Sequence, residues 1–161
     1  MSKSNGPSFV VSALPVERFE HLFGLSDDAL AERGALRVTA DDGRYPCRVT
    51  LEDAAPGQTL LLVNYQHQSA PTPYRSNYAI FVSEAARATR RLGPGELPPV
   101  LRGRSIALRA YDGAGMLLGA ELALADDVAA KALAQLEDPA VAYLHAHNAA
   151  HGCYAARIDR A

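Results

Sequence analysis

Alternating hydrophobic and polar residues dominate the chain after its first 35 residues. A two-residue period is typical of a strand with one buried face, and it predicts several strands joined by short turns. Turn signals stand at Asp42-Gly43, at Pro56-Gly57 and across residues 112–115. The strands predicted in this way are 36–41, 47–52, 59–67, 78–83, 105–111, 116–124, 141–148 and 153–158. The β-favourable residues Phe9, Val10 and Val11 predict one more strand over 8–14. Because the turns are short, we expect the strands to pair antiparallel.

Helical spacing interrupts this pattern in three places. Residues 16–23 carry hydrophobic side chains at helical intervals after Pro15. Ser26 is a suitable N-cap for a second short helix that ends at Gly34, and Asp126 or Asp127 can cap a third helix that Pro139 stops. The elements together predict a single α+β domain over residues 1–161, with a predominantly antiparallel sheet and helices on one face. Residues 1–7 are predicted to be a disordered tail.

Composition and charge narrow the possible functions. The chain has 161 residues and a formal net charge of −2, so it offers no basic surface for nucleic acid. No window approaches the ~20 apolar residues of a membrane span, and the N-terminus has no apolar signal-peptide core. We therefore expect a cytoplasmic protein. Cys47 alternates with Val49 and Leu51 and should point into the core, so it and Cys153 are predicted to be reduced and not bonded to each other.

Candidate chemistry gathers in the C-terminal strands. Side chains alternate along a strand, so Tyr143, His145 and His147 share one face, while Leu144 points to the other. If the apolar face covers the core, the two histidines lie together on the opposite face of the sheet.

The register of the hairpin follows from matching its largest aliphatic residues. When Leu144 and Ile158 both point to the core, a five-residue loop over 148–152 places His147 opposite Cys153. The same register places Tyr143 opposite Arg157. The sequence therefore predicts that both histidines share a face with Cys153 and Arg157.

This group of side chains is compatible with several kinds of site. His145, His147 and Cys153 form a plausible ligand set for zinc or a similar ion. Alternatively, Cys153 is a nucleophile activated by a histidine. Arg157 with the histidines can also receive a carboxylate or phosphate. The remaining interpretation is a solvated strand face without a site.

A second polar cluster follows an apolar strand in the middle of the chain. Asn64 and His67 lie at the end of that strand, where polar residues often line a pocket. The proline-containing loop 66–77 is predicted to pack over this pocket and to hold Arg75 near the sheet. Arg109, on a later strand, can extend either cluster.

The preferred functional hypothesis is a pocket that binds or processes a small anionic molecule. Its predicted lining is Asn64, His67, Arg75, Arg109, His145, His147 and Arg157. The alternatives are a metal-dependent enzyme that uses His145, His147 and Cys153, and an interaction module without a small-molecule site. The pattern leaves the cofactor and the oligomeric state open.

The same residues carry a resemblance to a known family. The matching segments are Tyr45-Pro46-Cys47-Arg48-Val49, Leu62-Val63-Asn64-Tyr65-Gln66-His67, Thr72-Pro73-Tyr74-Arg75-Ser76, Arg109-Ala110-Tyr111-Asp112 and the run over 143–160. With them the chain resembles the bacterial family catalogued as domain of unknown function 1203. The resemblance implies a stand-alone bacterial protein, and it carries no implication for an activity.

Overall fold

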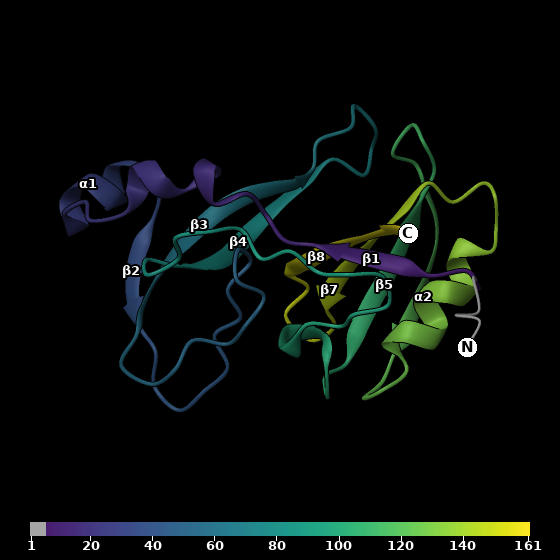
Figure 1. Ribbon diagram of the computed structural model, residues 1–161. Helices are drawn as coiled ribbons and strands as arrows, with labels where there is room; N and C mark the ends of the chain where they lie inside the picture. The colour runs from purple at the N-terminus through teal and green to yellow at the C-terminus, as the bar shows by residue number, and fades with distance from the viewer. Residues whose placement is uncertain (1–5) are drawn as a thin grey trace.

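Two antiparallel sheets form the framework of the protein (Figure 1). The computed structural model describes residues 6–161, so most of the predicted N-terminal tail lies outside the described residues. The larger sheet has the order β1-β8-β7-β5-β6, and the smaller one has the order β2-β3-β4. The predicted antiparallel α+β architecture is therefore confirmed.

The bounds of the elements follow the predicted pattern closely. The larger sheet consists of β1 (Phe9–Ser12), β5 (Ile106–Tyr111), β6 (Leu117–Ala123), β7 (Tyr143–Asn148) and β8 (Tyr154–Arg160). The smaller sheet consists of β2 (Leu36–Thr39), β3 (Thr59–Gln68) and β4 (Ser76–Ser83). The helices are α1 (Asp27–Glu32) and α2 (Val128–Leu136), with short 3-10 turns at Val16–Arg18, Glu20–Leu22 and Pro99–Leu101. Among the described residues, no helix is long and apolar enough to cross a membrane.

The two α-helices do not cover a common face. Ser26 caps α1 as predicted, by accepting a hydrogen bond from the backbone of Ala29, and α1 packs beside β2. In contrast, α2 packs on the larger sheet and contributes Val128, Ala132 and Leu136 to its core. Figure 1 shows the two helices at opposite ends of the molecule. The sequence pattern locates both α-helices but cannot assign each of them to a sheet, and the predicted helix over 16–23 is two short 3-10 turns instead.

The predicted strand 47–52 is wrong. The segment forms a tight turn in which the Leu51 backbone N–H donates to the Cys47 carbonyl, and Leu51 has a positive φ of 55°. The alternating residues Cys47, Val49 and Leu51 are buried as expected. A turn that closes on itself inside the core buries them as well as a strand would, so the alternation has a second structural solution.

The larger sheet separates an apolar core from a polar face. Leu108, Leu144 and Ile158 pack with α2 on one side. Side chains that alternate with them, including His145 and His147, face the other side. There the sheet meets the end of β3. A second core, which contains Tyr154 of β8 and residues of β3, β4 and the early 3-10 turns, holds the two sheets together.

Candidate metal centre

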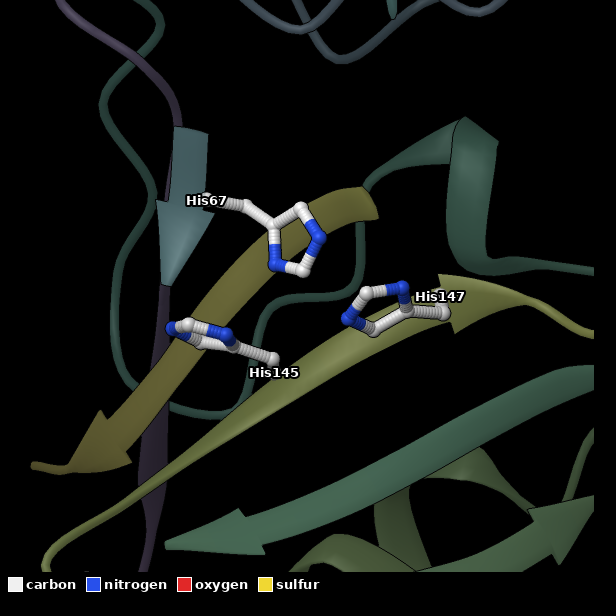
Figure 2. A group of neighbouring side chains, drawn as sticks. All are labelled: His67, His145 and His147. Carbon is white, nitrogen blue, oxygen red and sulfur yellow. The ribbon is translucent and has the colours of Figure 1, made fainter. Parts of the chain in front are cut away.

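Three histidines from two sheets converge at the point where the sheets meet. His145 and His147 come from β7, and His67 comes from the end of β3 (Figure 2). One ring nitrogen of each residue lies within 4.8 Å of the others. His145 is 4% exposed and His147 is fully buried, while His67 is partly buried. Figure 2 shows the rings surrounding a common space, with nitrogen atoms directed into it.

A bulge in β3 places His67 in this group. Gln66 pairs with Asn77 of β4, and Gln68 pairs with Ser76, so His67 is one extra residue on its strand. A β-bulge bends the strand and redirects its side chains, and bulges are frequent next to functional sites. The buried Gln68 donates to the Tyr143 hydroxyl, which fixes the end of β3 against β7.

A second bulge, in β8, corrects the predicted register of the hairpin. Ala146 pairs with Ala156 and His147 pairs with Tyr154, which leaves Ala155 as the extra residue. The predicted pairing of His147 with Cys153 is therefore wrong, and Arg157 pairs with His145 instead of Tyr143. The predicted register paired Leu144 with Ala156, whereas Leu144 pairs with Ile158. Matching apolar residues assigns the face of each strand, but it cannot reveal an extra residue near the loop.

The bulge also gives the site its aromatic wall. Tyr154 turns to the histidine face, where its ring stacks on His67 with centroids 5.7 Å apart and planes 8° apart. The same ring meets His145 and His147 edge-on, at 5.2 and 5.9 Å. Burial raises the pKa of Tyr154, so its hydroxyl stays protonated at neutral pH. Since one rigid ring touches all three imidazoles, the packing restricts their orientations.

Hydrogen bonding indicates how the protons of the buried rings are arranged. His147 Nδ1 lies 2.9 Å from the Gly152 carbonyl oxygen, which can only accept, so Nδ1 carries the proton and Nε2 has a free lone pair. This Nε2 is buried and has no hydrogen-bond partner. Nδ1 of His67 and Nδ1 of His145 are also buried without a partner. Each ring thus has one buried nitrogen that nothing in the described protein satisfies.

Electrostatics keep these rings neutral. Burial, together with the nearby charge of Arg109, lowers the pKa of His67 to about 4. Burial is the main cause that lowers the pKa of His145 and of His147 to about 3, and the neighbouring His67 and Arg109 contribute to the same shift. At neutral pH no proton has to leave before the rings bind a cation through nitrogen.

The spacing suits a small divalent ion. In a tetrahedral zinc site with Zn–N bonds of about 2.0–2.1 Å, two ligand nitrogens lie about 3.3 Å apart. The 4.8 Å limit found here exceeds that spacing by at most about 1.5 Å, which modest side-chain rotation can close. The bond from His147 Nδ1 to the Gly152 carbonyl is the kind of outer hydrogen bond that usually orients a metal-bound histidine.

A large open cavity of about 1040 Å³ leads to the histidines. His67, His145, Tyr154 and Arg157 are among the residues that line it. Arg18, Arg33, Asn64 and Tyr65 also line the cavity, and no Asp or Glu belongs to the described lining. The lining therefore combines two imidazole rings of the cluster with several positive charges.

The predicted site residues separate into two groups. Asn64, His67, His145 and Arg157 line this cavity, and His147 lies behind them as part of the histidine cluster. Arg109 pairs with His145 across β5 and β7, and its positive charge lowers the pKa of all three histidines. The structure therefore brings these six residues together, His67 and Asn64 through the contact between the two sheets.

Arg75 and Cys153 are the exceptions. Arg75 is exposed and donates to the Ser69 carbonyl within its own loop, so it lines no part of the cavity. The loop itself does dock, because Thr72 donates to the Gly115 carbonyl. Cys153 accepts a weak hydrogen bond from Asn148 and lines a different cavity. In the predicted ligand set of His145, His147 and Cys153, the structure replaces Cys153 by His67.

The sequence reasoning missed Tyr154 and Gln68. Both lie next to bulges, and the parity of a regular strand assigns Tyr154 to the apolar face. The sequence did contain a signal for an aromatic wall, namely several tyrosines close to the two histidines of β7. In the structure Tyr111 and Tyr143 both pack on His145, with centroids 5.0 and 5.2 Å from its ring.

Comparison with known proteins places this site in a family. The sequence model of a family described as a protein of unknown function (DUF1203) matches residues 44–160. The chain belongs to the DUF1203 family. The three clustered histidines of this DUF1203 protein lie within the matched region. Neither a curated protein nor a solved structure gives a match to the chain.

Proposed function

We propose that this DUF1203 protein is a metal-dependent enzyme. His67, His145 and His147 hold one divalent ion of the zinc type, and a small anionic substrate reaches the ion through the arginine-lined cavity. The observation that carries the proposal is the convergence of three rings that each have a buried, unpartnered nitrogen.

A metal accounts for these nitrogens better than packing alone. A buried polar atom without a partner costs about 1–3 kcal/mol, so three of them in one place are a substantial local penalty. One ion bonded to all three nitrogens removes that penalty at once. Neutral imidazole is a common ligand of zinc, copper, iron and nickel, whereas calcium and magnesium prefer oxygen. The all-nitrogen set therefore favours a transition metal.

The number of ligands favours a catalytic ion over a structural one. Structural zinc sites are closed by four protein ligands, while catalytic sites use three and leave a position for water or substrate. The described residues supply three histidines and no fourth His, Cys, Asp or Glu to the group. An open zinc position lowers the pKa of bound water to about 7 and so provides a nucleophile for hydrolysis or hydration.

The charges around the cavity support an anionic substrate. Arg157 lies 4.2 Å above the Tyr143 ring and is held by Asp159 beside the histidines. Arg18 donates to the Tyr65 hydroxyl on the cavity wall. Three neutral histidines leave the full charge of a divalent ion uncompensated, which adds to the attraction for a carboxylate or phosphate.

Metal analysis of the protein, purified without a histidine tag, tests the proposal. We expect calorimetric titration of the EDTA-treated protein with Zn²⁺ to give one tight site. His145→Ala and His147→Ala should abolish that site, while His21→Ala and His151→Ala, which change histidines outside the cluster, should retain it. Zinc binding that survives both cluster variants, or no binding by the wild type, would overturn the proposal.

A further inference from the structure

A second cavity of about 550 Å³ lies outside the metal centre. Its apolar wall includes Leu62, Tyr78 and Phe81 of the smaller sheet. The loop over 148–153 and Arg48 form its polar part. Cavities of about 300–1,000 Å³ that combine apolar walls with a few polar groups are the usual form of small-molecule sites.

Arg48 is the unusual feature of this cavity. Its side chain is 2% exposed, yet it forms no ion pair with a carboxylate of the described residues. Nε donates to the Tyr154 carbonyl at 2.7 Å and Nη1 donates to the Pro46 carbonyl, whereas Nη2 takes part in neither bond. Burial lowers the pKa of Arg48, as expected for a charge removed from water.

Two partly buried arginines of the protein are compensated by carboxylates, whereas Arg109, also partly buried, makes no ion pair among the described residues. Arg37 binds both Asp27 and Glu84, and Arg104, which lines the same cavity, binds Asp53. A buried cation without a counter-charge is costly because it loses its hydration and gains no attraction in return. Arg48 therefore stands out as the fully buried arginine of the described residues, with the Cys153 thiol as a neighbour in the cavity wall and no carboxylate beside it.

We propose that this cavity binds a small organic carboxylate, whose charged group lies on Arg48 and whose apolar body lies against Tyr78 and Phe81. A guanidinium matches a carboxylate with paired hydrogen bonds, which supplies the missing counter-charge. Asn148 and Ser105 add polar groups to the same lining. The apolar wall favours an organic acid over inorganic phosphate, because phosphate has no apolar body to bury.

The rate at which Cys153 is alkylated reports whether a ligand occupies the cavity. Cys153 lines the cavity and is partly exposed, whereas Cys47 is buried, so iodoacetamide labelling followed peptide by peptide reports the two thiols separately. We expect hexanoate and benzoate to slow the alkylation of Cys153 in a saturable manner. Benzyl alcohol, hexylamine and inorganic phosphate, each lacking either the negative charge or the apolar body, should have little effect.

Two variants test the residues that carry the inference. Arg48→Met should weaken hexanoate binding, measured by calorimetry, by about tenfold or more because it removes a charge-assisted pair. If Arg48→Met fails to fold, Ala150→Trp decides: it fills the cavity from its exposed loop and should abolish protection. Its control is Ala114→Trp, which places the same side chain on an exposed turn away from this cavity and should preserve protection.

The result is separable from the metal proposal. The variant His145→Asn should bind hexanoate as the wild type does, since His145 does not line this cavity and its Nδ1 has no hydrogen-bond partner. Loss of hexanoate binding in that variant would mean that the acid binds at the histidines, and it would overturn the inference. Equal protection by benzyl alcohol and hexanoate, or undiminished protection in Ala150→Trp, would overturn it as well.

Discussion

Replacing His145 by leucine separates the requirements of folding from those of metal binding. His145 is 4% exposed, its Nδ1 has no partner, and its ring packs among Tyr111, Tyr143 and Tyr154. Leucine has a similar volume and no polar atom. Removal of a buried unpartnered nitrogen recovers about 1–3 kcal/mol, from which some loss of ring packing must be subtracted. In EDTA we therefore expect His145→Leu to be about as stable as the wild type, or more stable by about 1 kcal/mol.

With excess Zn²⁺ the wild type should become more stable than His145→Leu. A ligand that binds only the folded state at 100 times its Kd adds about 2.7 kcal/mol to the free energy of unfolding. The wild type should gain this stabilisation, and His145→Leu should not. Urea unfolding followed by circular dichroism, with EDTA or with excess Zn²⁺, measures both effects.

The neighbouring residue provides the control for this measurement. Leu144 lies on the opposite, apolar face and is fully buried. Leu144→Ala should lose about 2–5 kcal/mol in EDTA and still gain stability from zinc. If His145→Leu instead loses 2 kcal/mol or more in EDTA and keeps the zinc effect, His145 is a structural residue and the reasoning fails.

Three further predictions concern acid stability, a turn and the thiols. The folded pKa of both β7 histidines is about 3 against 6.5 for the free side chain, so the unfolded chain takes up protons first as the pH falls. In urea titrations of the metal-free protein, the free energy of unfolding should be nearly full at pH 7 and fall by about 2 kcal/mol per ring down to pH 5. A flat profile would contradict this. Gly115 has φ +82°, and a Cβ there would lie 2.3 Å from Ala70 Cβ, so Gly115→Ala should lower Tm by several degrees while Gly113→Ala, with open space around it, should not; equal Tm values would show that the docked loop is unimportant. Native protein should react with iodoacetamide at Cys153 much faster than at the buried Cys47, and the reverse order in peptide mapping would show that the fold is wrong around these residues.

The parts of the fold that depend on simple periodicity were predictable. Alternation located the strands of both sheets, and Ser26 was identified as a helix cap from its position alone. The loop over 148–152 closes the last hairpin as predicted, and its Gly152 has φ +80°. Local rules suffice here because each feature depends on neighbouring residues in the chain.

The parts that depend on irregular backbone were not predictable. His67 and Ala155 are bulge residues, and a bulge shifts the face of every residue beyond it. This shift brought Tyr154 to the histidines and removed Cys153 from them. The encounter of His67 with β7 is a contact between two sheets, so it follows from packing rather than from a local pattern. The burial of Arg48 was not predicted either. The alternation of Cys47 and Val49 suggested that Arg48 faces outward.

Anomalous scattering from crystals of the untagged protein grown with Zn²⁺ tests the central claim most directly. Data collected on both sides of the zinc absorption edge locate the ion without reference to any assay. The account predicts one peak with a nitrogen of His67, of His145 and of His147 each at about 2.0–2.1 Å, and with a fourth position open to the cavity. A map without a peak between these three rings, or a zinc ion bound through Cys153 in the second cavity, would contradict it.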